Sequence, residues 1–297
     1  MKIGFIGLGA MGLPMARRVI ENGYEVTTLV HRHRKPAEEL AAIGAQILST
    51  PAELARHADT VITILPADAE LKETIFGKDG LLEGLTPGMV LVEMTTATAF
   101  CMKEVEVAVA KAGARVLDAP VSGGTPAAAN GTLTIMVGGE DDLLEQCRPL
   151  LETMGKNILH VGGVGQGKVI KMVNQVLAAV HLLAMGEAVA LGVRCGAEPK
   201  VIYEVLKTSS GYSRMMDLRL PGFLFEGQFK PGFRLDLMKK DLNLCVDSAQ
   251  ELGVPLLFGG LAAQLFSAAS MAGRGDEDFA AAADFLAGLA NANLECC

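Results

Sequence analysis

The 297-residue chain contains no tryptophan, and only 5% of its residues are aromatic. Its core therefore has to be built mostly from aliphatic side chains, with 14 methionines as adaptable filling. The 6 cysteines include no C-x-x-C pair, and the 5 histidines are scattered along the chain. The sequence thus predicts neither a disulfide framework nor a metal site, and we expect a reduced, cytoplasmic protein.

Positive charge is also in short supply, because 26 Lys and Arg residues face 34 Asp and Glu residues, a net charge of −8. This balance argues against a general nucleic-acid-binding surface. It does not exclude a small anionic ligand, which a few local cations can bind. We expect no secretory leader, since the apolar start lacks a basic segment and a cleavage site. Residues 176–193 are apolar but interrupted by His181 and Glu187, which favours a buried helix over a membrane span.

The clearest pattern lies at the start of the chain. Residues 2–6 are typical of a buried strand, and residues 13–21 indicate a helix. Between them Gly7, Gly9 and Gly12 form G-x-G-x-x-G. In a dinucleotide-binding turn the first glycine permits the tight turn, the second lets the main chain approach a pyrophosphate, and the third lets helix pack on strand. A purely structural glycine turn is the alternative. The predicted dinucleotide-binding residues are Gly7, Leu8, Gly9, Ala10, Met11 and Gly12.

The residues after the second predicted strand bear on the type of dinucleotide. A carboxylate often stands here to bind the ribose hydroxyls of NAD. Residues 31–35 (HRHRK) hold no carboxylate, and Arg32 is able to pair with a 2′-phosphate through two hydrogen bonds. We therefore favour NADPH over NADH, with NAD as the alternative. A solvated basic loop is the other interpretation for His33, Arg34 and Lys35.

Short strand patterns alternate with helical patterns through the first half of the chain, which is typical of a parallel, doubly wound α/β sheet of the Rossmann type. Besides residues 2–6, we expect strands at residues 25–30, 46–48, 60–65, 90–93, 115–118, 132–137 and 157–161. Ligands bind beyond the carboxyl ends of the strands in such sheets. Leu65, Pro66 and Thr96 lie at such ends and are expected beside the dinucleotide.

The pattern changes after the glycine cluster at residues 162–167. From Lys168 onward the periodicity is helical, starting with a long helix over residues 168–194. We therefore expect a dinucleotide-binding domain at residues 1–163 and an all-α domain at residues 164–297, joined by the long helix. The apolar surface of that helix and of the Ala/Leu-rich tail exceeds what one small domain can bury, which predicts a homodimer or homotetramer.

Residues 118–124 (DAPVSGG) lie at a predicted strand end. The hydroxyl of Ser122 and the accessible main-chain amides of Gly123 and Gly124 are suited to binding a carboxylate. An ordinary loop with a helix cap is the alternative, because serine and glycine are common loop residues.

Lys171 lies in an apolar helical stretch, where it shares a helix face with Asn174 and Gln175. A lysine so placed either extends to solvent along its apolar stem or is held in a polar pocket, where it is able to act as an acid–base group. The sequence by itself leaves both interpretations open.

Together these stretches resemble the β-hydroxyacid dehydrogenase family, which includes 3-hydroxyisobutyrate dehydrogenases and tartronate semialdehyde, glyoxylate and succinic semialdehyde reductases. The resemblance covers essentially the whole chain. Its motifs are residues 4–15, 118–124, 131–139, 165–174 and 240–242.

The resemblance implies an enzyme that interconverts a small carboxylate-bearing hydroxy acid with its aldehyde or keto acid. It implies that Lys171 is the catalytic acid–base and that Ser122 and the two glycines after it bind the substrate carboxylate. Thr96 would lie on the nicotinamide side. Lys240 would reach the cofactor and substrate site from the helical domain. Asn174 or Gln175 would orient the reacting oxygen.

The subgroup stays open. Gln175 stands where the family often has a second asparagine, and with residues 229–234 (FKPGFR) it resembles tartronate semialdehyde reductases. Residues 207–213 instead resemble 2-(hydroxymethyl)glutarate dehydrogenases. A non-catalytic nucleotide-binding module is the alternative of another class. An imine reductase is disfavoured by Lys171, since the acid–base lysine is generally replaced there, and a decarboxylating sugar-phosphate dehydrogenase needs a longer helical domain.

Overall fold

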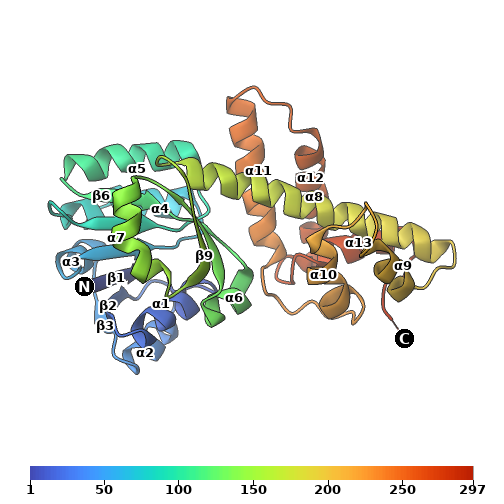
Figure 1. The fold of residues 1–297 in the computed structure, drawn as a ribbon, viewed down its shortest axis with the longest axis horizontal. Helices are drawn as coiled ribbons and strands as arrows, with labels where there is room; N and C mark the ends of the chain where they lie inside the picture. Colours follow the sequence, from blue (N-terminus) through green and yellow to red (C-terminus); the bar gives the residue numbers. More distant parts are fainter. Residues whose placement is uncertain (297) are drawn as a thin grey trace. The chain divides into compact units, whose positions relative to one another are not determined.

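The computed structural model describes residues 1–296 and divides the chain into two compact units, Met1–Lys171 and Met172–Cys297 (Figure 1). The division falls inside helix α8 (Gln166–Arg194), which begins in the first unit and ends in the second. The domain boundary between residues 163 and 164 stays a prediction from the sequence.

The first unit is built on one sheet of 9 strands, in the spatial order β3-β2-β1-β4-β5-β6-β8-β7, with β9 beside β8. The strands are β1 (Lys2–Ile6), β2 (Glu25–Leu29), β3 (Gln46–Leu48), β4 (Thr60–Thr63), β5 (Val90–Glu93), β6 (Arg115–Asp118), β7 (Val121–Ser122), β8 (Leu133–Gly138) and β9 (Gly155–Gly162). The pairs from β3 to β6 are all parallel, which confirms the Rossmann-type class. The strand order reverses direction between β1 and β4, which is where dinucleotides bind in such folds.

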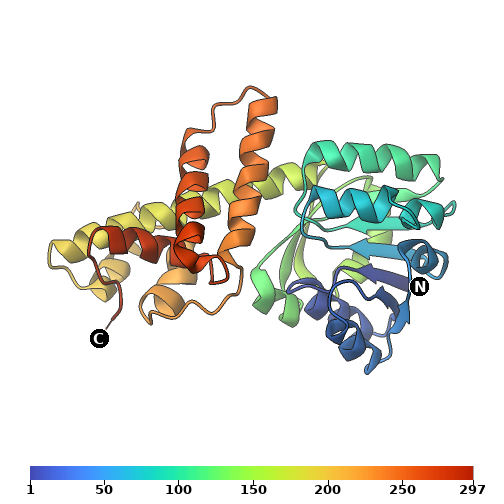
Figure 2. The ribbon, with the colours of Figure 1, turned by 180° about the vertical axis from the view of Figure 1, so that it is seen from behind.

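Helices cover both faces of this sheet (Figures 1 and 2). They are α1 (Gly12–Glu21), α2 (Lys35–Ala41), α3 (Pro51–Arg56), α4 (Asp68–Phe76), α5 (Ala99–Lys111), α6 (Gly124–Asn130) and α7 (Asp141–Leu151), with a 3₁₀ turn, η1 (Leu81–Glu83). Side chains alternate between the two faces of a strand. Ile3 and Phe5 of β1 accordingly join one buried cluster with Met15 of α1, whereas Ile6 joins a second cluster with Leu54 of α3. Both faces of β1 are thus buried, which explains its continuous apolar sequence.

The sheet beyond β6 differs from the all-parallel arrangement that the sequence predicts. Strand β8 runs antiparallel to both β6 and β7, and only β9 lies parallel to it. The chain between β6 and β8 forms the short strand β7 and the 7-residue helix α6. A parallel neighbour needs a crossover connection, usually with a helix long enough to cross the sheet. The chain therefore reverses direction at this edge.

The regular secondary structure of the second unit's described residues is helical, as the sequence predicts, apart from one isolated β-bridge between Arg234 and Asp278. After α8 come α9 (Pro199–Leu206), α10 (Arg214–Arg219), the π-helical turn η2 (Leu220–Leu224), α11 (Leu235–Glu251), α12 (Leu257–Ala269), the π-helical turn η3 (Ser270–Arg274) and α13 (Ala281–Leu289). Leu182 of α8, Leu242 of α11 and Phe266 of α12 are fully buried in the core of this unit.

Helix α8 is long and apolar enough to cross a membrane by length and composition alone, and 39% of its most apolar segment is buried. Leu182 and Val189 lie in the core of the second unit, whereas Leu177 and Leu191 are 50% and 68% exposed. One face of α8 is therefore a core face and another face is apolar but exposed. The homo-oligomer stays a prediction, with this exposed apolar face as its basis.

Candidate active site

The glycines of the turn after β1 have different roles. Gly7 has a φ of +105°, which residues with side chains rarely adopt, and a Cβ there would lie 2.0 Å from the carbonyl oxygen of Ile64. A Cβ on Gly12 would lie 1.7 Å from the carbonyl oxygen of Gly7. By contrast, a Cβ on Gly9 would meet no atom within 4 Å. The fold therefore requires Gly7 and Gly12, whereas Gly9 borders open space.

The start of α1 follows this open space. No side chain caps the helix, and its first turn holds no acidic residue. Gly9 and Ala10 are exposed, whereas Leu8 and Met11 pack partly against the core. The main-chain N–H groups and the positive dipole end of a helix start attract phosphate groups. The turn thus fits the pyrophosphate of a dinucleotide, held by main-chain groups.

Arg32 follows β2 at the carboxyl edge of the sheet, and it is exposed. Among residues 1–296, no hydrogen bond or ion pair involves its guanidinium group. The nearby Arg34 instead pairs with Glu38, with 2.9 Å between Nε and Oε1. Arg32 therefore has its hydrogen-bond donors available for an anion, whereas Arg34 is already paired.

The loops after β4 and β5 are joined to each other. The main-chain N–H of Leu65 donates a hydrogen bond of 2.9 Å to the hydroxyl of Thr95, which is fully buried. Thr96 is partly exposed, and so is Leu65, while Pro66 is exposed. The buried Thr95 therefore joins the loop after β4 to the loop after β5, a role that the sequence did not indicate. Thr96 is the threonine that presents part of its surface outward.

The loop predicted to bind a carboxylate comprises the last residue of β7 and the start of α6. Gly123 and Gly124 have φ values of +137° and +69°, so this main-chain path suits glycine. No side chain caps α6. Ser122 is partly exposed, and no hydrogen bond joins its hydroxyl to another residue in 1–296. A hydroxyl and neighbouring main-chain amides are therefore present where the sequence predicts them.

Two lysines lie on successive turns at the start of α8. Lys171 is buried, with 6% of its surface exposed, so it does not extend to solvent. Lys168 is fully buried and forms an ion pair with Glu93, the last residue of β5. The burial of Lys171 fits the acid–base interpretation, and the ion pair gives Lys168 a different role.

The second unit holds the amides that follow Lys171 on α8. Asn174 donates from Nδ2 to Oε1 of Gln175 at 3.0 Å, and Gln175 donates from Nε2 to Oδ2 of Asp241 at 2.7 Å. Lys240 pairs with the other carboxylate oxygen of Asp241, also at 2.7 Å. Asp241, only 2% exposed, is thus the centre of this group. The sequence indicated it only as part of residues 240–242.

Comparison with known proteins gives the family. Residues 2–162 match the family model described as the NAD binding domain of 6-phosphogluconate dehydrogenase. Residues 165–286 match the NAD-binding of NADP-dependent 3-hydroxyisobutyrate dehydrogenase. The chain is 38% identical to 2-(hydroxymethyl)glutarate dehydrogenase of Eubacterium barkeri, over 95% of this chain and 93% of that protein. It is 37% identical to the mitochondrial 3-hydroxyisobutyrate dehydrogenase of Mus musculus, over 96% of this chain and 86% of that protein.

A solved structure of the same kind of enzyme matches the fold of this chain. The 3-hydroxyisobutyrate dehydrogenase of Mycobacterium tuberculosis with L-serine has a TM-score of 0.88 at 32% identity, over 96% of this chain and 98% of that one. The chain belongs to the β-hydroxyacid dehydrogenase family. This β-hydroxyacid dehydrogenase is therefore an oxidoreductase that binds a nicotinamide cofactor and acts on small hydroxy acids.

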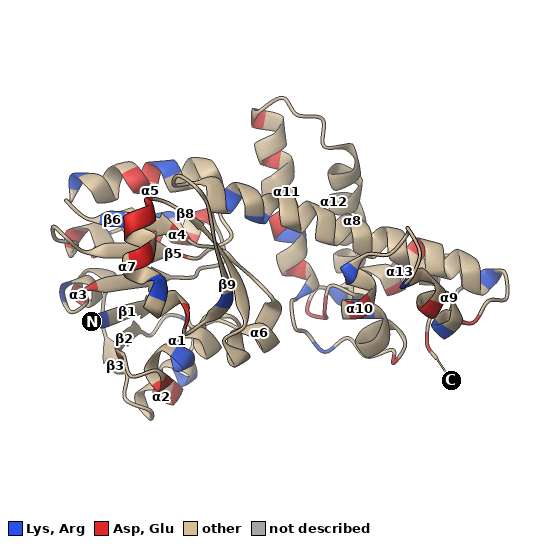
Figure 3. Cartoon of the chain, in the orientation of Figure 1, with Lys and Arg blue, Asp and Glu red and all other residues tan. Residues whose placement is uncertain are grey.

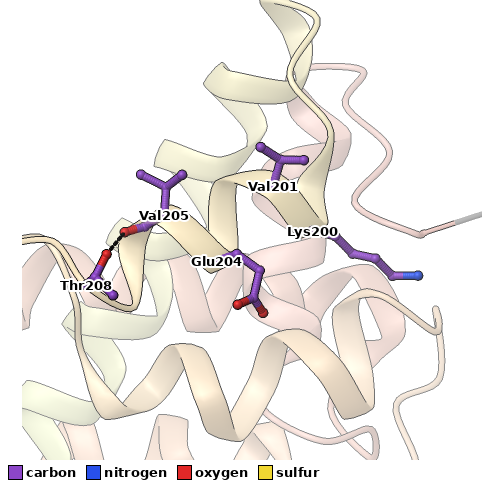
Figure 4. A pocket seen from close by; sticks show the side chains of 5 residues that line it. All are labelled: Lys200, Val201, Glu204, Val205 and Thr208. Carbon is purple, nitrogen blue, oxygen red and sulfur yellow. Dashed lines mark hydrogen bonds between the residues drawn. The ribbon is translucent and has the colours of Figure 1, made fainter.

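The rest of the described surface shows no second group of candidate site residues. Lys and Arg positions are interspersed with Asp and Glu positions in both units (Figure 3). A shallow open hollow on α9 is lined by Lys200, Val201, Glu204, Val205 and Thr208 (Figure 4). It contains none of the predicted site residues. Within residues 1–296, no group of His, Cys, Asp or Glu side chains is arranged to hold a metal ion.

The turn after β1 gives a prediction that separates binding from stability. Gly9→Ala should keep the wild-type Tm but weaken NADPH binding by about tenfold, which is about 1.4 kcal/mol, because the methyl group enters the space that a pyrophosphate needs. Gly12→Ala should lower the free energy of unfolding by about 1–3 kcal/mol, because its Cβ overlaps the main chain. Thermal unfolding and a fluorescence titration with NADPH measure the two effects. Equal destabilisation by both variants would contradict this division of roles.

Proposed function

We propose that the protein is an NADP-dependent enzyme that interconverts a 2-substituted 3-hydroxypropionate and its semialdehyde, with tartronate semialdehyde as the preferred aldehyde. The burial of Lys171 carries this proposal, because a lysine held away from solvent in a chain that binds a nicotinamide cofactor is able to serve as a proton donor. The names of the relatives support the substrate class. 3-Hydroxyisobutyrate, 2-(hydroxymethyl)glutarate and serine all contain a hydroxymethyl group on the carbon that bears the carboxylate.

The chain's own residues have separate tasks in the proposed reaction. The nicotinamide, when bound, supplies the hydride that the aldehyde carbon accepts. The ammonium of Lys171 donates a hydrogen bond to the aldehyde oxygen and transfers its proton there as negative charge develops. The product is the hydroxymethyl group, and the neutral lysine regains a proton from water. In the oxidative direction Lys171 accepts the hydroxyl proton instead.

Binding of the substrate carboxylate fixes the reacting carbon. The hydroxyl of Ser122 and the main-chain amides of Gly123 and Gly124 donate hydrogen bonds to this carboxylate in the proposed complex. Asn174 shares a helix face with Lys171 and orients the reacting oxygen. Gln175 acts through Asn174, because its own amide is bound to Asn174 on one side and to Asp241 on the other.

Two features favour tartronate semialdehyde within this class. They are Gln175 and residues 229–234, which resemble tartronate semialdehyde reductases. The second candidate is 2-(hydroxymethyl)glutarate, which residues 207–213 and the 38% identical relative favour. Its substituent carries a second carboxylate, whereas that of tartronate semialdehyde is a hydroxyl group. A pocket for the first needs a further cation, and a pocket for the second needs only a hydrogen-bond partner. 3-Hydroxyisobutyrate is the remaining candidate of this class, and glyoxylate and succinic semialdehyde are the candidates outside it.

A panel of these substrates tests the assignment, with NADPH and NADH for the aldehydes and with NADP⁺ and NAD⁺ for the hydroxy acids. We expect the highest kcat/KM for tartronate semialdehyde with NADPH. A higher kcat/KM for 2-(hydroxymethyl)glutarate or 3-hydroxyisobutyrate than for glycerate, the reduced form of tartronate semialdehyde, all in the oxidative direction, would replace the tartronate semialdehyde assignment and leave the class intact. Turnover of glyoxylate or succinic semialdehyde alone, or of no member of the panel, would reject the class.

Replacement of the proton donor gives a second prediction. Lys171→Ala should fold and bind NADPH normally, and its kcat should fall by about 10²–10⁴-fold, because general acid catalysis is lost. Lys111→Ala, at the exposed end of α5, is the matched control and should behave as wild type. A near-wild-type kcat in Lys171→Ala would show that another group donates the proton.

The cofactor preference gives a third prediction, which rests on Arg32. Arg32→Glu should weaken NADPH binding by about 10–100-fold and leave NADH binding nearly unchanged, because a carboxylate repels a 2′-phosphate but is able to bind ribose hydroxyls. Arg34→Glu makes the same charge reversal at an arginine that is already paired with Glu38. It should change the two affinities much less. Equal losses of NADPH affinity in the two variants would attribute the effect to general charge.

A further inference from the structure

Lys168 and Glu93 form a buried ion pair that the proposed reaction does not use. Both side chains have an exposure of 0%. Glu93 ends β5, and Lys168 lies in the first turn of α8. A buried ion pair loses its hydration, and well-packed apolar residues in its place are often equally stable or more stable. Stability alone therefore does not account for a lysine and a glutamate at these positions.

The ammonium group of Lys168 has one ion-pair contact and two hydrogen bonds. Its Nζ pairs with Oε2 of Glu93 and donates hydrogen bonds of 2.9 Å to the main-chain oxygens of Glu93 and Thr95. The other carboxylate oxygen of Glu93 accepts hydrogen bonds from the main-chain N–H of Thr95 at 2.8 Å and from the hydroxyl of Thr63 at 3.4 Å. An ammonium has three donors. The pair therefore fixes the end of β5 and the residues after it against the first turn of α8.

A second strand holds the same helix turn. Asp118, the last residue of β6, accepts hydrogen bonds of 2.9 Å from the main-chain N–H groups of Gly165 and Lys168. Asp118 and Glu93 are direct neighbours in the register of β5 and β6. The start of α8 is thus bound through its main chain to β6 and through a side chain to β5. These contacts leave the turn little freedom to move.

We propose that the Lys168–Glu93 ion pair positions the loop of Thr95 and Thr96 against the turn of α8 that carries Lys171. This inference rests on the proposed function, in which Thr96 lies on the nicotinamide side and Lys171 donates the proton. The aldehyde carbon and its oxygen have to meet hydride and proton at the same time. A misplacement of about 1 Å between such groups lowers turnover by about 100-fold. Lys168 and Glu93 are positioning residues that act through Thr96 and Lys171.

The paired variant Lys168→Met/Glu93→Leu tests the proposal, because it removes both charges and keeps the volume. We expect a Tm within about 5 °C of wild type and an NADPH affinity within about threefold, since the glycine turn and Arg32 are unchanged. We expect kcat to fall by about 100-fold. The isotope effect on kcat of NADPH that carries deuterium at both C4 positions should rise, because misplaced groups make hydride transfer limit turnover. In the cofactor-free variant, amide hydrogen exchange should become faster at residues 94–97 and 166–171.

An exposed ion pair of the same unit provides the control. Lys72→Gln/Glu104→Gln removes an exposed ion pair of the same unit, with 2.6 Å between its charged atoms, and should change none of these quantities. If the paired variant does not fold, the same measurements are made on Lys168→Gln, because the glutamine amide still donates to a carbonyl oxygen. Wild-type kcat, isotope effect and hydrogen exchange in a folded variant would overturn the proposal. Failure of the wild-type enzyme to oxidise NADPH with any member of the panel rejects the proposed function instead, and hydrogen exchange still reports on the pair.

Discussion

The carboxylate of Asp118 determines where α8 begins, and the placement of Lys171 depends on that point. Its two oxygens bind the main-chain N–H groups of Gly165 and Lys168, so the first helical turn is fixed at the carboxyl end of β6. The approach is so close that a Cβ on Gly167 would lie 2.6 Å from Oδ2 of Asp118. Gly167 in the first turn of α8 is thus required by packing, whereas Gly9 in the turn after β1 borders open space. Glycine density alone does not distinguish these two uses.

Much of the first unit could be predicted from the sequence, because strands buried on both faces are continuous apolar runs. The bounds of β1, β5 and β6 agree with their predicted ranges, and the helical character of the second unit follows from its periodicity. The edge at β7 and β8 could not be predicted in this way. Strand direction there depends on a 2-residue strand and a 7-residue helix, which are too short to give a periodic signal.

Candidate site residues could be predicted where their role follows from neighbouring residues in the sequence. They could not be predicted where the role depends on a partner far away in the sequence. Gly7, Gly12 and Arg32 follow from spacing after a strand. Lys168 and Lys171, by contrast, lie in one apolar run, and only the contact with Glu93, 75 residues away, distinguishes them. Asp241 likewise binds Gln175 across 66 residues. Such pairings arise from the topology, so no sequence periodicity indicates them.

The central claim is that this chain transfers a hydride from NADPH to the aldehyde carbon while the proton comes from an exchangeable group. Reduction of tartronate semialdehyde in ordinary water with NADPH that carries deuterium at both C4 positions, followed by mass spectrometry and NMR of the product, tests it most directly. Direct hydride transfer predicts one deuterium atom on the hydroxymethyl carbon, and no deuterium on this carbon when unlabelled NADPH is used in D₂O. A product without deuterium from the cofactor, or with solvent deuterium on that carbon, would contradict it.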